Sequence, residues 1–506
     1  MNKFWLLWRN YQQYLPPAII LLVALILRLP LLNGSFWLDE AAQALESARP
    51  LSAQLDIIPD FQPPLLHLIT HFALYVSSAE WWLRTIGALI PGLITVWATF
   101  ELGKKLAGGF AGSIAALLLA TNSFHIFYSQ ELRPYSLATM FALLGWLILA
   151  NWKKYRPKNR VLGLSVVTAL GLYSSYLYPF VVFSQALYCF IFKKKFHQQF
   201  VTAFSFGALA FLPWLPTFLR QLEAGQYLRQ VIPGWETVVS LSQLKALPLT
   251  LGKFLYGIIN IDFTPAYIIP TLMISSLLAM LLASDYLTNR TKTRKYFKIM
   301  TVWILFPLLT AWTISFVVPV ISPKRILFLL PLMYLYIAIV VGPYLQDKAT
   351  SLRGGLAVLV IIILALINMG GVMQYYSQPS LQRENWRQLY RQMSIQYPAD
   401  TSVAVYSFPE PFAPMRWYDT QNYPAITTGE LHVDRVKNLP GQLKNITNYR
   451  YVLVFDYLMD LTDPQRKVLA VIRDFGYHEV DQLDYPNIGF VRVFTQSETV
   501  TAQLSN

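Results

Sequence analysis

The chain has 506 residues, of which 55% are hydrophobic and 13% are charged, whereas about a quarter of the residues of an ordinary soluble domain carry a charge. Its net charge is +14, yet residues 380–506 hold 12 Lys and Arg against 14 Asp and Glu. The positive excess therefore lies in the apolar part of the chain, which excludes nucleic acid as the expected partner and is typical of cytoplasmic loops between membrane spans.

Apolar residues up to about residue 375 fall into runs long enough to cross a bilayer, which takes about 20 residues. Five basic loops separate these runs: Lys104–Lys105, Lys153–Arg160, Lys193–Lys195, Arg290–Lys298 and Lys348–Arg353. If all five face the cytoplasm, the spans between them come in pairs. We therefore predict a polytopic α-helical membrane protein with about 11 transmembrane helices over residues 1–379. The predicted spans are 16–32, 81–102, 109–127, 134–151, 161–176, 178–192, 199–219, 266–286, 299–319, 326–345 and 355–375.

The apolar segment Pro63–Val76 is an exception, because it is short, begins with two prolines and contains two histidines. Counting it as a span would invert the side of every later loop and place the basic loops outside. We therefore interpret it as an interfacial or re-entrant helix on the outer side. This topology places the first outer loop, residues 33–80, and the C-terminal domain on the extracytoplasmic side of a plasma (inner) membrane.

An adjacent pair of acids, Asp39 and Glu40, follows the first predicted span. Two neighbouring carboxylates near low-dielectric lipid repel each other, which suits a general base or a cation site. The alternative is a helix N-terminus, in which Asp39 is the cap and Glu40 lies in the first turn.

A second motif runs from Asp60 through Pro63 and Pro64 to His67. The stiff Pro-Pro turn is suited to fixing this loop against the first motif, with Asp60 and His67 as further site candidates. The alternative for His67 is a structural or interfacial histidine.

A third motif, Tyr128–Tyr135 with the sequence YSQELRPY, lies where one predicted span ends and the next begins. Its Glu131 and Arg133 are charged groups at membrane depth, where charges are costly and usually mark a site or a pair. The alternative is a Glu131–Arg133 ion pair that closes a helical hairpin.

Two cations, Lys324 and Arg325, lie on the outer side between two spans and break the pattern of basic cytoplasmic loops. They suit the anionic head group of a lipid. The alternative is that their side chains only extend into the head-group region. Arg84, at the outer end of the second span, is a weaker case of the same kind.

Residues 380–506 are predicted to form a soluble α/β domain. Short β-rich runs at 402–406, 451–455 and 490–494 predict strands, and residues 385–395 and 464–475 have the spacing of helices.

Taken in order, the four motifs resemble glycosyltransferase family 39, a group within the wider GT-C membrane fold. The group includes the protein O-mannosyltransferases and the lipid A aminoarabinose transferases. The resemblance is carried by Asp39–Glu40, Gln62–Leu65, Leu83–Arg84 and, most specifically, Tyr128–Tyr135. It is dense over residues 15–150 and loose to residue 345. Gln62 departs from the pattern, since it stands where the family commonly has histidine and an amide cannot carry a proton.

The resemblance implies an inverting transfer of a sugar from a polyprenyl-phosphate donor to an acceptor hydroxyl on the outer side. It implies that Asp39 is the general base and that Glu40 orients the acceptor or supports Asp39. It assigns Arg133 with Glu131 to the donor or phosphate site, and topology assigns Lys324 and Arg325 to the phosphate. The predicted site residues are Asp39 and Glu40 as catalytic, Arg84, Glu131, Arg133, Lys324 and Arg325 as donor-binding, and Asp60, His67 and Tyr128 as further candidates.

The partners expected are the polyprenyl-phosphate-sugar donor, membrane lipids and a lipid, glycan or protein acceptor. No cofactor is assigned, and a divalent metal is left open. Three other interpretations stay open. One is a transporter or flippase of a lipid-linked substrate, although the internal symmetry common in transporters is not visible. The others are a ligase of the same fold whose acceptor is a lipid-linked glycan, and a membrane-anchored binding protein in which only the tail functions.

Overall fold

The structure, a computed structural model, describes residues 15–58, 60–232, 243–259, 265–287, 291–318, 321–346 and 352–496. The chain divides into two compact units. The helical unit comprises Met1–Asn33, Leu51–Leu219 and Val239–Leu381. The C-terminal unit comprises Gly34–Pro50, Arg220–Val238 and Gln382–Asn506. The acidic motif therefore clusters with the tail of the chain, although we assigned loop 33–80 to the membrane part. The domain boundary between residues 379 and 380 stays a prediction.

Each of the eleven predicted spans contains at least one helix, although the first helix ends at Ile26, before the predicted end of its span at residue 32, and the fifth span is helical only to Leu172. Parts of two predicted basic loops, residues 290 and 348–351, lie outside the described residues. The helices of this part of the chain are α2 (Leu15–Ile26), α4 (Leu65–Leu74), α5 (Glu80–Arg84), α6 (Ile90–Ala107), α7 (Gly109–Thr121), α8 (Ser123–Tyr128), α9 (Tyr135–Ala150), α10 (Pro157–Leu172), α11 (Tyr178–Phe192), α12 (His197–Leu209), α13 (Leu215–Val231), α15 (Gln243–Tyr256), α16 (Pro265–Leu287), α17 (Thr291–Met300), α18 (Phe306–Ile314), α19 (Leu330–Gln346) and α20 (Leu352–Ser377).

Within the described residues, five helical stretches are long and apolar enough to cross a membrane. They are Glu80–Ala107, Lys194–Leu228, Lys295–Ile314, Leu327–Gln346 and Leu352–Ser377. Six further apolar helices are shorter, and α4 within the exceptional segment Pro63–Val76 is one of them. The count of eleven spans and the interfacial placement of α4 therefore stay predictions. Helix α15 was not predicted, because it lies in the stretch 220–265 that we expected to be a loop.

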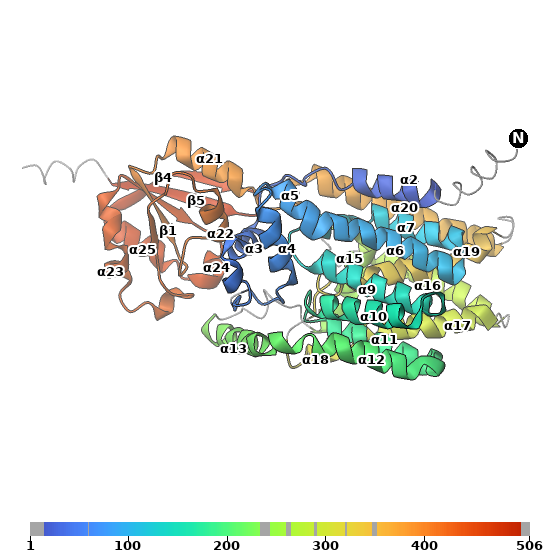
Figure 1. The fold of residues 1–506 in the computed structure, drawn as a ribbon. Helices are drawn as coiled ribbons and strands as arrows, with labels where there is room; N and C mark the ends of the chain where they lie inside the picture. Colours follow the sequence, from blue (N-terminus) through green and yellow to red (C-terminus); the bar gives the residue numbers. More distant parts are fainter. Residues whose placement is uncertain are drawn as a thin grey trace, which may run out of the picture. The chain divides into compact units, whose positions relative to one another are not determined.

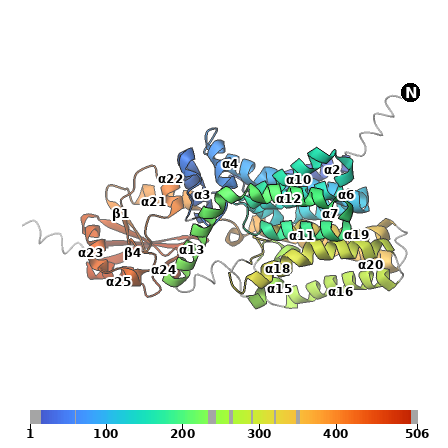
Figure 2. The same ribbon diagram turned by 60° about the horizontal axis from the view of Figure 1, so that its bottom comes forward.

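Small residues bring the first long helices of the helical unit together. A Cβ atom on Gly103 of α6 would lie 2.6 Å from the Cα atom of Gly112 of α7, so the two backbones touch without side chains between them. Helix α6 also packs on α9, and α7 on α19, as the bundle in Figure 1 shows. In the turned view of Figure 2, α16 lies along α20.

A five-stranded sheet forms the centre of the C-terminal unit. Its strands are β1 (Ser402–Tyr406), β2 (Ala425–Thr427), β3 (Tyr451–Phe455), β4 (Tyr477–Tyr485) and β5 (Gly489–Gln496). Their order is β2-β1-β3-β5-β4, with β2, β1 and β3 parallel and β5 antiparallel to both of its neighbours. The three predicted strands correspond to β1, β3 and β5. Strands β2 and β4 were missed, because one has three residues and the other carries polar residues on its exposed face.

Side chains alternate along the central strands, so the sheet has an apolar core on each face. Tyr406 and Phe455 lie in one core with residues of α21 (Trp386–Gln396) and α22 (Ala413–Tyr418). Val403 and Val454 lie in the other core with α23 (Leu439–Leu443) and α25 (Lys467–Asp474). The predicted helix at 464–475 begins late, at Lys467, because the Asp463 carboxylate accepts hydrogen bonds from the backbone N–H groups of Lys467 and Val468.

Candidate active site

The acid pair lies at the start of helix α3 (Leu38–Ala48), within the C-terminal unit. The residue before the helix is Trp37, whose own side chain makes no capping hydrogen bond. The alternative interpretation as a helix N-terminus is confirmed in that Glu40 lies in the first turn, but Asp39 is not the N-cap, because it too lies inside the first turn. Carboxylates there are favoured by the positive end of the helix dipole. Helix α3 packs against α22 of the same unit, and the Tyr418 hydroxyl accepts a 2.7 Å hydrogen bond from the Phe36 backbone N–H just before it.

The two acids of the pair have different surroundings. Glu40 is fully buried, and its Oε2 atom lies 3.7 Å from Nε of Arg383, whose side chain is 8% exposed. Asp39 is only partly buried. The ion pair with Arg383 holds the buried Glu40 carboxylate in place, whereas Asp39 retains contact with solvent. This difference is the one expected of a supporting acid beside a reactive one.

A third carboxylate, which the sequence did not point to, belongs to the same region. Glu384 accepts hydrogen bonds from the backbone N–H of Leu38 at 3.3 Å, from Nε1 of Trp386 at 2.6 Å and from the Tyr457 hydroxyl at 2.8 Å. Burial and the neighbouring charge of Asp39 raise the pKa of Glu384 to about 7, although these hydrogen bonds oppose the shift. Nothing in the local sequence distinguishes Glu384 from any glutamate that precedes a helix.

In the helical unit, the structure joins the second motif to the third. Arg133 donates from NH1 and NH2 to the Asp60 carboxylate, at 3.2–3.3 Å. Nε2 of His67 lies 3.1 Å from Oδ2 of the same carboxylate. Burial would raise the pKa of Asp60, but the charge of Arg133 and the hydrogen bond to His67 lower it to about 2. Asp60 is therefore ionised at any physiological pH and balances the charge of Arg133.

Gln62 completes this cluster and accounts for the departure from the family pattern. Its amide nitrogen donates to Oδ2 of Asp60 and lies 3.0 Å from Nε2 of His67. Helix α4 begins at Leu65, directly after Pro63 and Pro64, and this places His67, which is fully buried, in its first turn. The amide therefore orients the carboxylate and the imidazole without carrying a proton.

The central residues of the YSQELRPY motif are buried within the helical unit. Ser129 packs directly against Gly92. A Cβ atom added to Gly92 would lie 2.4 Å from the Ser129 hydroxyl oxygen. Gln130 donates to the backbone carbonyl of Arg28 at 2.8 Å and accepts a hydrogen bond from the Tyr375 hydroxyl at 3.1 Å. Glu131 is also buried, at 2% exposure. These contacts tie helices far apart in the sequence together, so part of the motif's specificity is structural.

The fourth motif lies against the third. The Lys324 ammonium is 5.7 Å from the centre of the Tyr135 ring, and the Tyr135 ring makes an edge contact with Tyr128 at 5.2 Å. A cation over an aromatic face is held by the ring quadrupole. Both Lys324 and Arg325 remain partly exposed. The structure thus brings Lys324 to the motif nearly two hundred residues earlier in the chain.

Arg84 has a structural contact. It is fully buried, and its NH1 atom donates to the backbone carbonyl of Leu32 at 3.0 Å. The helix changes to a single π-helical turn, Thr85–Leu89, directly after it. This contact holds the end of the first apolar segment, and the donor-binding role of Arg84 stays a prediction.

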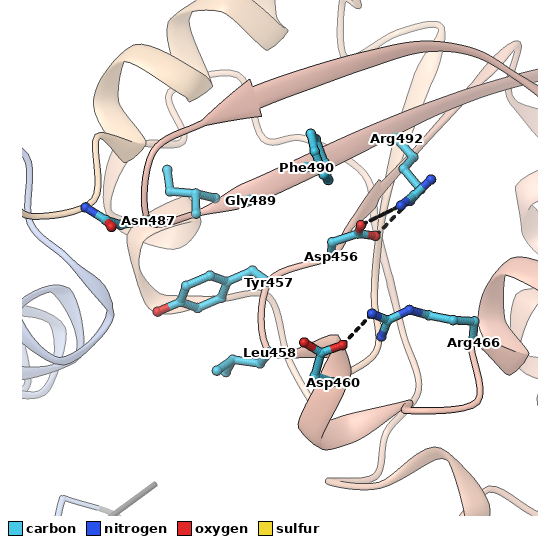
Figure 3. A pocket seen from close by; sticks show the side chains of 10 residues that line it. Asp456, Tyr457, Leu458, Asp460, Arg466, Asn487, Gly489, Phe490 and Arg492 are labelled. Atoms are coloured by element: carbon cyan, nitrogen blue, oxygen red, sulfur yellow. Dashed lines mark hydrogen bonds and ion pairs between the residues drawn. The ribbon is translucent and has the colours of Figure 1, made fainter. Parts of the chain in front are cut away.

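A groove of about 670 Å³ lies in the C-terminal unit at the end of β3. Figure 3 shows its two ion pairs, Asp456 with Arg492 and Asp460 with Arg466, and shows the Tyr457 hydroxyl pointing away from both. None of the predicted site residues lines it. In the part of the chain that the structure describes, no three His, Cys, Asp or Glu side chains form a group that could hold a metal ion.

The sequence of residues 61–217 matches the family model of the dolichyl-phosphate-mannose-protein mannosyltransferases. No curated protein sequence matches the chain. Solved structures that resemble nearly the whole chain include an oligosaccharyltransferase and ArnT. The oligosaccharyltransferase is AglB from Archaeoglobus fulgidus, in complex with an inhibitory peptide and a dolichol-phosphate. It is 13% identical, the similarity covers 97% of this chain and 75% of AglB, and the TM-score is 0.52.

The other structure is ArnT from Cupriavidus metallidurans bound to undecaprenyl phosphate. It is 9% identical, the similarity covers 95% of this chain and 98% of ArnT, and the TM-score is 0.56. Together with the family model, these similarities show that the chain has the GT-C fold that the motifs led us to expect.

Proposed function

We propose that this protein is a membrane glycosyltransferase that moves a sugar from a polyprenyl-phosphate donor to an acceptor hydroxyl, with inversion, on the extracytoplasmic face. The observation that carries the proposal is a likeness over 95% of the chain to a transferase solved with undecaprenyl phosphate. The family match over residues 61–217, which contain the third motif and all of the second except Asp60, supports it.

On the acceptor side, Asp39 is the proposed general base. Its carboxylate takes the proton from the acceptor hydroxyl as the oxygen attacks the anomeric carbon. The bond between that carbon and the phosphate oxygen breaks, and the configuration inverts because attack and departure are on opposite faces. Buried Glu40, paired with Arg383, supports Asp39. The partial exposure of Asp39 beside a fixed neighbour suits this division of roles.

On the donor side, the leaving group is a polyprenyl phosphate, whose negative charge grows as the sugar departs. Fixed cations aimed at that charge lower the barrier. Lys324 is the proposed phosphate-binding cation, with Arg325 next to it, because Lys324 is partly exposed and lies over Tyr135 of the third motif. Arg133 has its charge balanced by Asp60, so we propose that Arg133, with Glu131, shapes the donor site.

The test is a transfer assay on the purified full chain in lipid vesicles. A polyprenyl-phosphate donor with a radiolabelled sugar should release polyprenyl phosphate and label an added acceptor. A transporter or flippase would move the intact lipid between leaflets and leave the sugar–phosphate bond uncleaved. Translocation of intact donor with no cleavage, across a panel of hexose and pentose donors, would contradict the proposal.

A further inference from the structure

Two consecutive residues of the tail, Arg383 and Glu384, contact the first turn of α3. Arg383 pairs with Glu40 at 3.7 Å. Glu384 accepts a hydrogen bond from the backbone N–H of Leu38, 346 residues earlier in the chain, at 3.3 Å. Asp39 stands between these two points of attachment. The position of its carboxylate therefore depends on side chains outside the motif.

We propose that Glu384 is a positioning residue for Asp39, whose ionised carboxylate holds the first turn of α3 in the orientation that transfer requires. The inference rests on the proposed function, because it assigns Glu384 a role in the same reaction. It adds a residue of the C-terminal unit to that reaction.

The hydrogen bonds around Glu384 suit a carboxylate, because both of its oxygens accept. Three donors meet its two oxygens: the Leu38 N–H and Trp386 Nε1–H on Oε2, and the Tyr457 hydroxyl on Oε1. A protonated acid or an amide would present a donor of its own to one of these groups. The charged form is also favoured by the positive end of the α3 dipole.

Holding that charge is costly, which is unusual for a purely structural contact. The titratable groups that act on Glu384 include Asp39 on α3 and Tyr457, and Arg383 precedes it in the chain. Burial and the charge of Asp39 raise the pKa of Glu384 to about 7. A carboxyl group whose folded pKa lies above its unfolded value makes folding less favourable as the pH rises between the two values. Above pH 7 the protein therefore keeps an ionised group that opposes its own stability, as sites that need a particular charge often do.

Glu384→Gln in the full chain tests the inference. At pH 8 we expect kcat to fall about tenfold or more, since a misoriented base loses its catalytic advantage, while KM for the donor changes by less than about twofold. The wild type should lose activity as the pH falls through about 7, and the variant should lack this acidic limb. Glu410→Gln is the matched control, because Glu410 lies in the same unit with its side chain 61% exposed.

A second variant keeps the inference testable if Glu384→Gln does not fold. Tyr457→Phe removes one donor and leaves the ring in place. The Tyr457 hydrogen bond lowers the pKa of Glu384, so its loss should move the acidic limb to higher pH. A wild-type kcat in Glu384→Gln, or an unmoved limb in both variants, overturns the inference and leaves the proposed function standing if Asp39→Asn is inactive. Full activity in Asp39→Asn overturns the base assignment and the inference with it.

Discussion

Arg133 and Asp60 form a bidentate ion pair across 73 residues of sequence, with NH1 and NH2 of the guanidinium 3.2 Å from Oδ1 of the carboxylate. The two side chains are 12% and 13% exposed. The pair joins the loop before α4 to the turn between α8 and α9, and His67 lies against it at 3.1 Å. This pairing makes the second and third motifs one structural unit.

Breaking this pair should destabilise the protein. Arg133→Gln or Asp60→Asn leaves one nearly buried charge without its main partner, which costs about 3 kcal/mol for a pair this enclosed. The thermal midpoint in detergent should fall clearly at a fixed scan rate for either variant, and the double variant should lose less than the sum of the two. Arg416→Gln is the control, because its ion pair with Glu410 is exposed and should contribute little. Equal midpoints for Arg133→Gln and Arg416→Gln would contradict the structural role.

Because of the Arg133–Asp60 ion pair, we expect the stability of the protein to depend on pH in the acidic range. The pKa of Asp60 is lowered from 3.8 to about 2, so its ionised form stabilises the folded state. That contribution, about 2 kcal/mol, is complete above pH 3.8 and is lost as the pH falls through 2. Thermal midpoints measured between pH 2 and pH 5 should therefore fall more steeply for the wild type than for Asp60→Asn. Parallel curves would show that Asp60 does not titrate in this range.

Asp39→Asn tests the proposed base. The amide keeps the size of the side chain but cannot accept the acceptor's proton, so kcat should fall by about 10²–10⁴. Binding of the donor should stay within about twofold, because interactions made only in the transition state lower kcat alone. Initial rates and equilibrium donor binding on the same preparation give both quantities. Turnover at the wild-type rate would remove Asp39 as base.

Lys324→Ala should weaken the donor side selectively. Loss of a fixed cation near the departing phosphate should raise the donor KM about tenfold and lower kcat as well, with the acceptor KM little changed. Lys324→Arg should keep more activity than Lys324→Ala, because the positive charge next to the Tyr135 ring is retained. Arg325→Ala, measured alone and with Lys324→Ala, shows whether the adjacent cation shares the role. A rise in the acceptor KM alone would contradict the assignment.

The topology is open to a labelling test. Gly109→Cys, in a Cys189→Ala background, should be inaccessible to an impermeant reagent added outside, because the basic loop at Lys104–Lys105 is predicted to be cytoplasmic. A Cβ atom at Gly109 meets nothing within 4 Å, and Cys189 is the single native cysteine and is buried. Ser78→Cys, at an exposed residue before α5, should be labelled from outside. Labelling of Gly109→Cys would overturn the interfacial assignment of Pro63–Val76.

Sequence periodicity and local propensity were enough for much of the fold. Each apolar run that we predicted to be a span contains a helix, and the β-branched runs predicted β1, β3 and β5. The misses have local causes: β2 is short, β4 is polar, and α15 lies in a stretch with few uninterrupted apolar residues. The motifs contain the residues of the Asp60 cluster, and around Asp39 and Glu40 they lack only Glu384, Arg383 and Tyr457. Those three carry no local signal, since their importance comes from what they touch.

The sequence by itself determined that the chain carries a series of apolar runs up to about residue 375, that its charges are asymmetric, and that acids follow the first apolar run. These properties depend on composition and on short-range spacing. Only the tertiary structure decided that Arg133 meets Asp60, that Lys324 lies over Tyr135, and that Glu384 holds the turn that carries Asp39. Such pairings follow from how distant segments pack, and packing is set by the summed burial of many side chains rather than by any one motif.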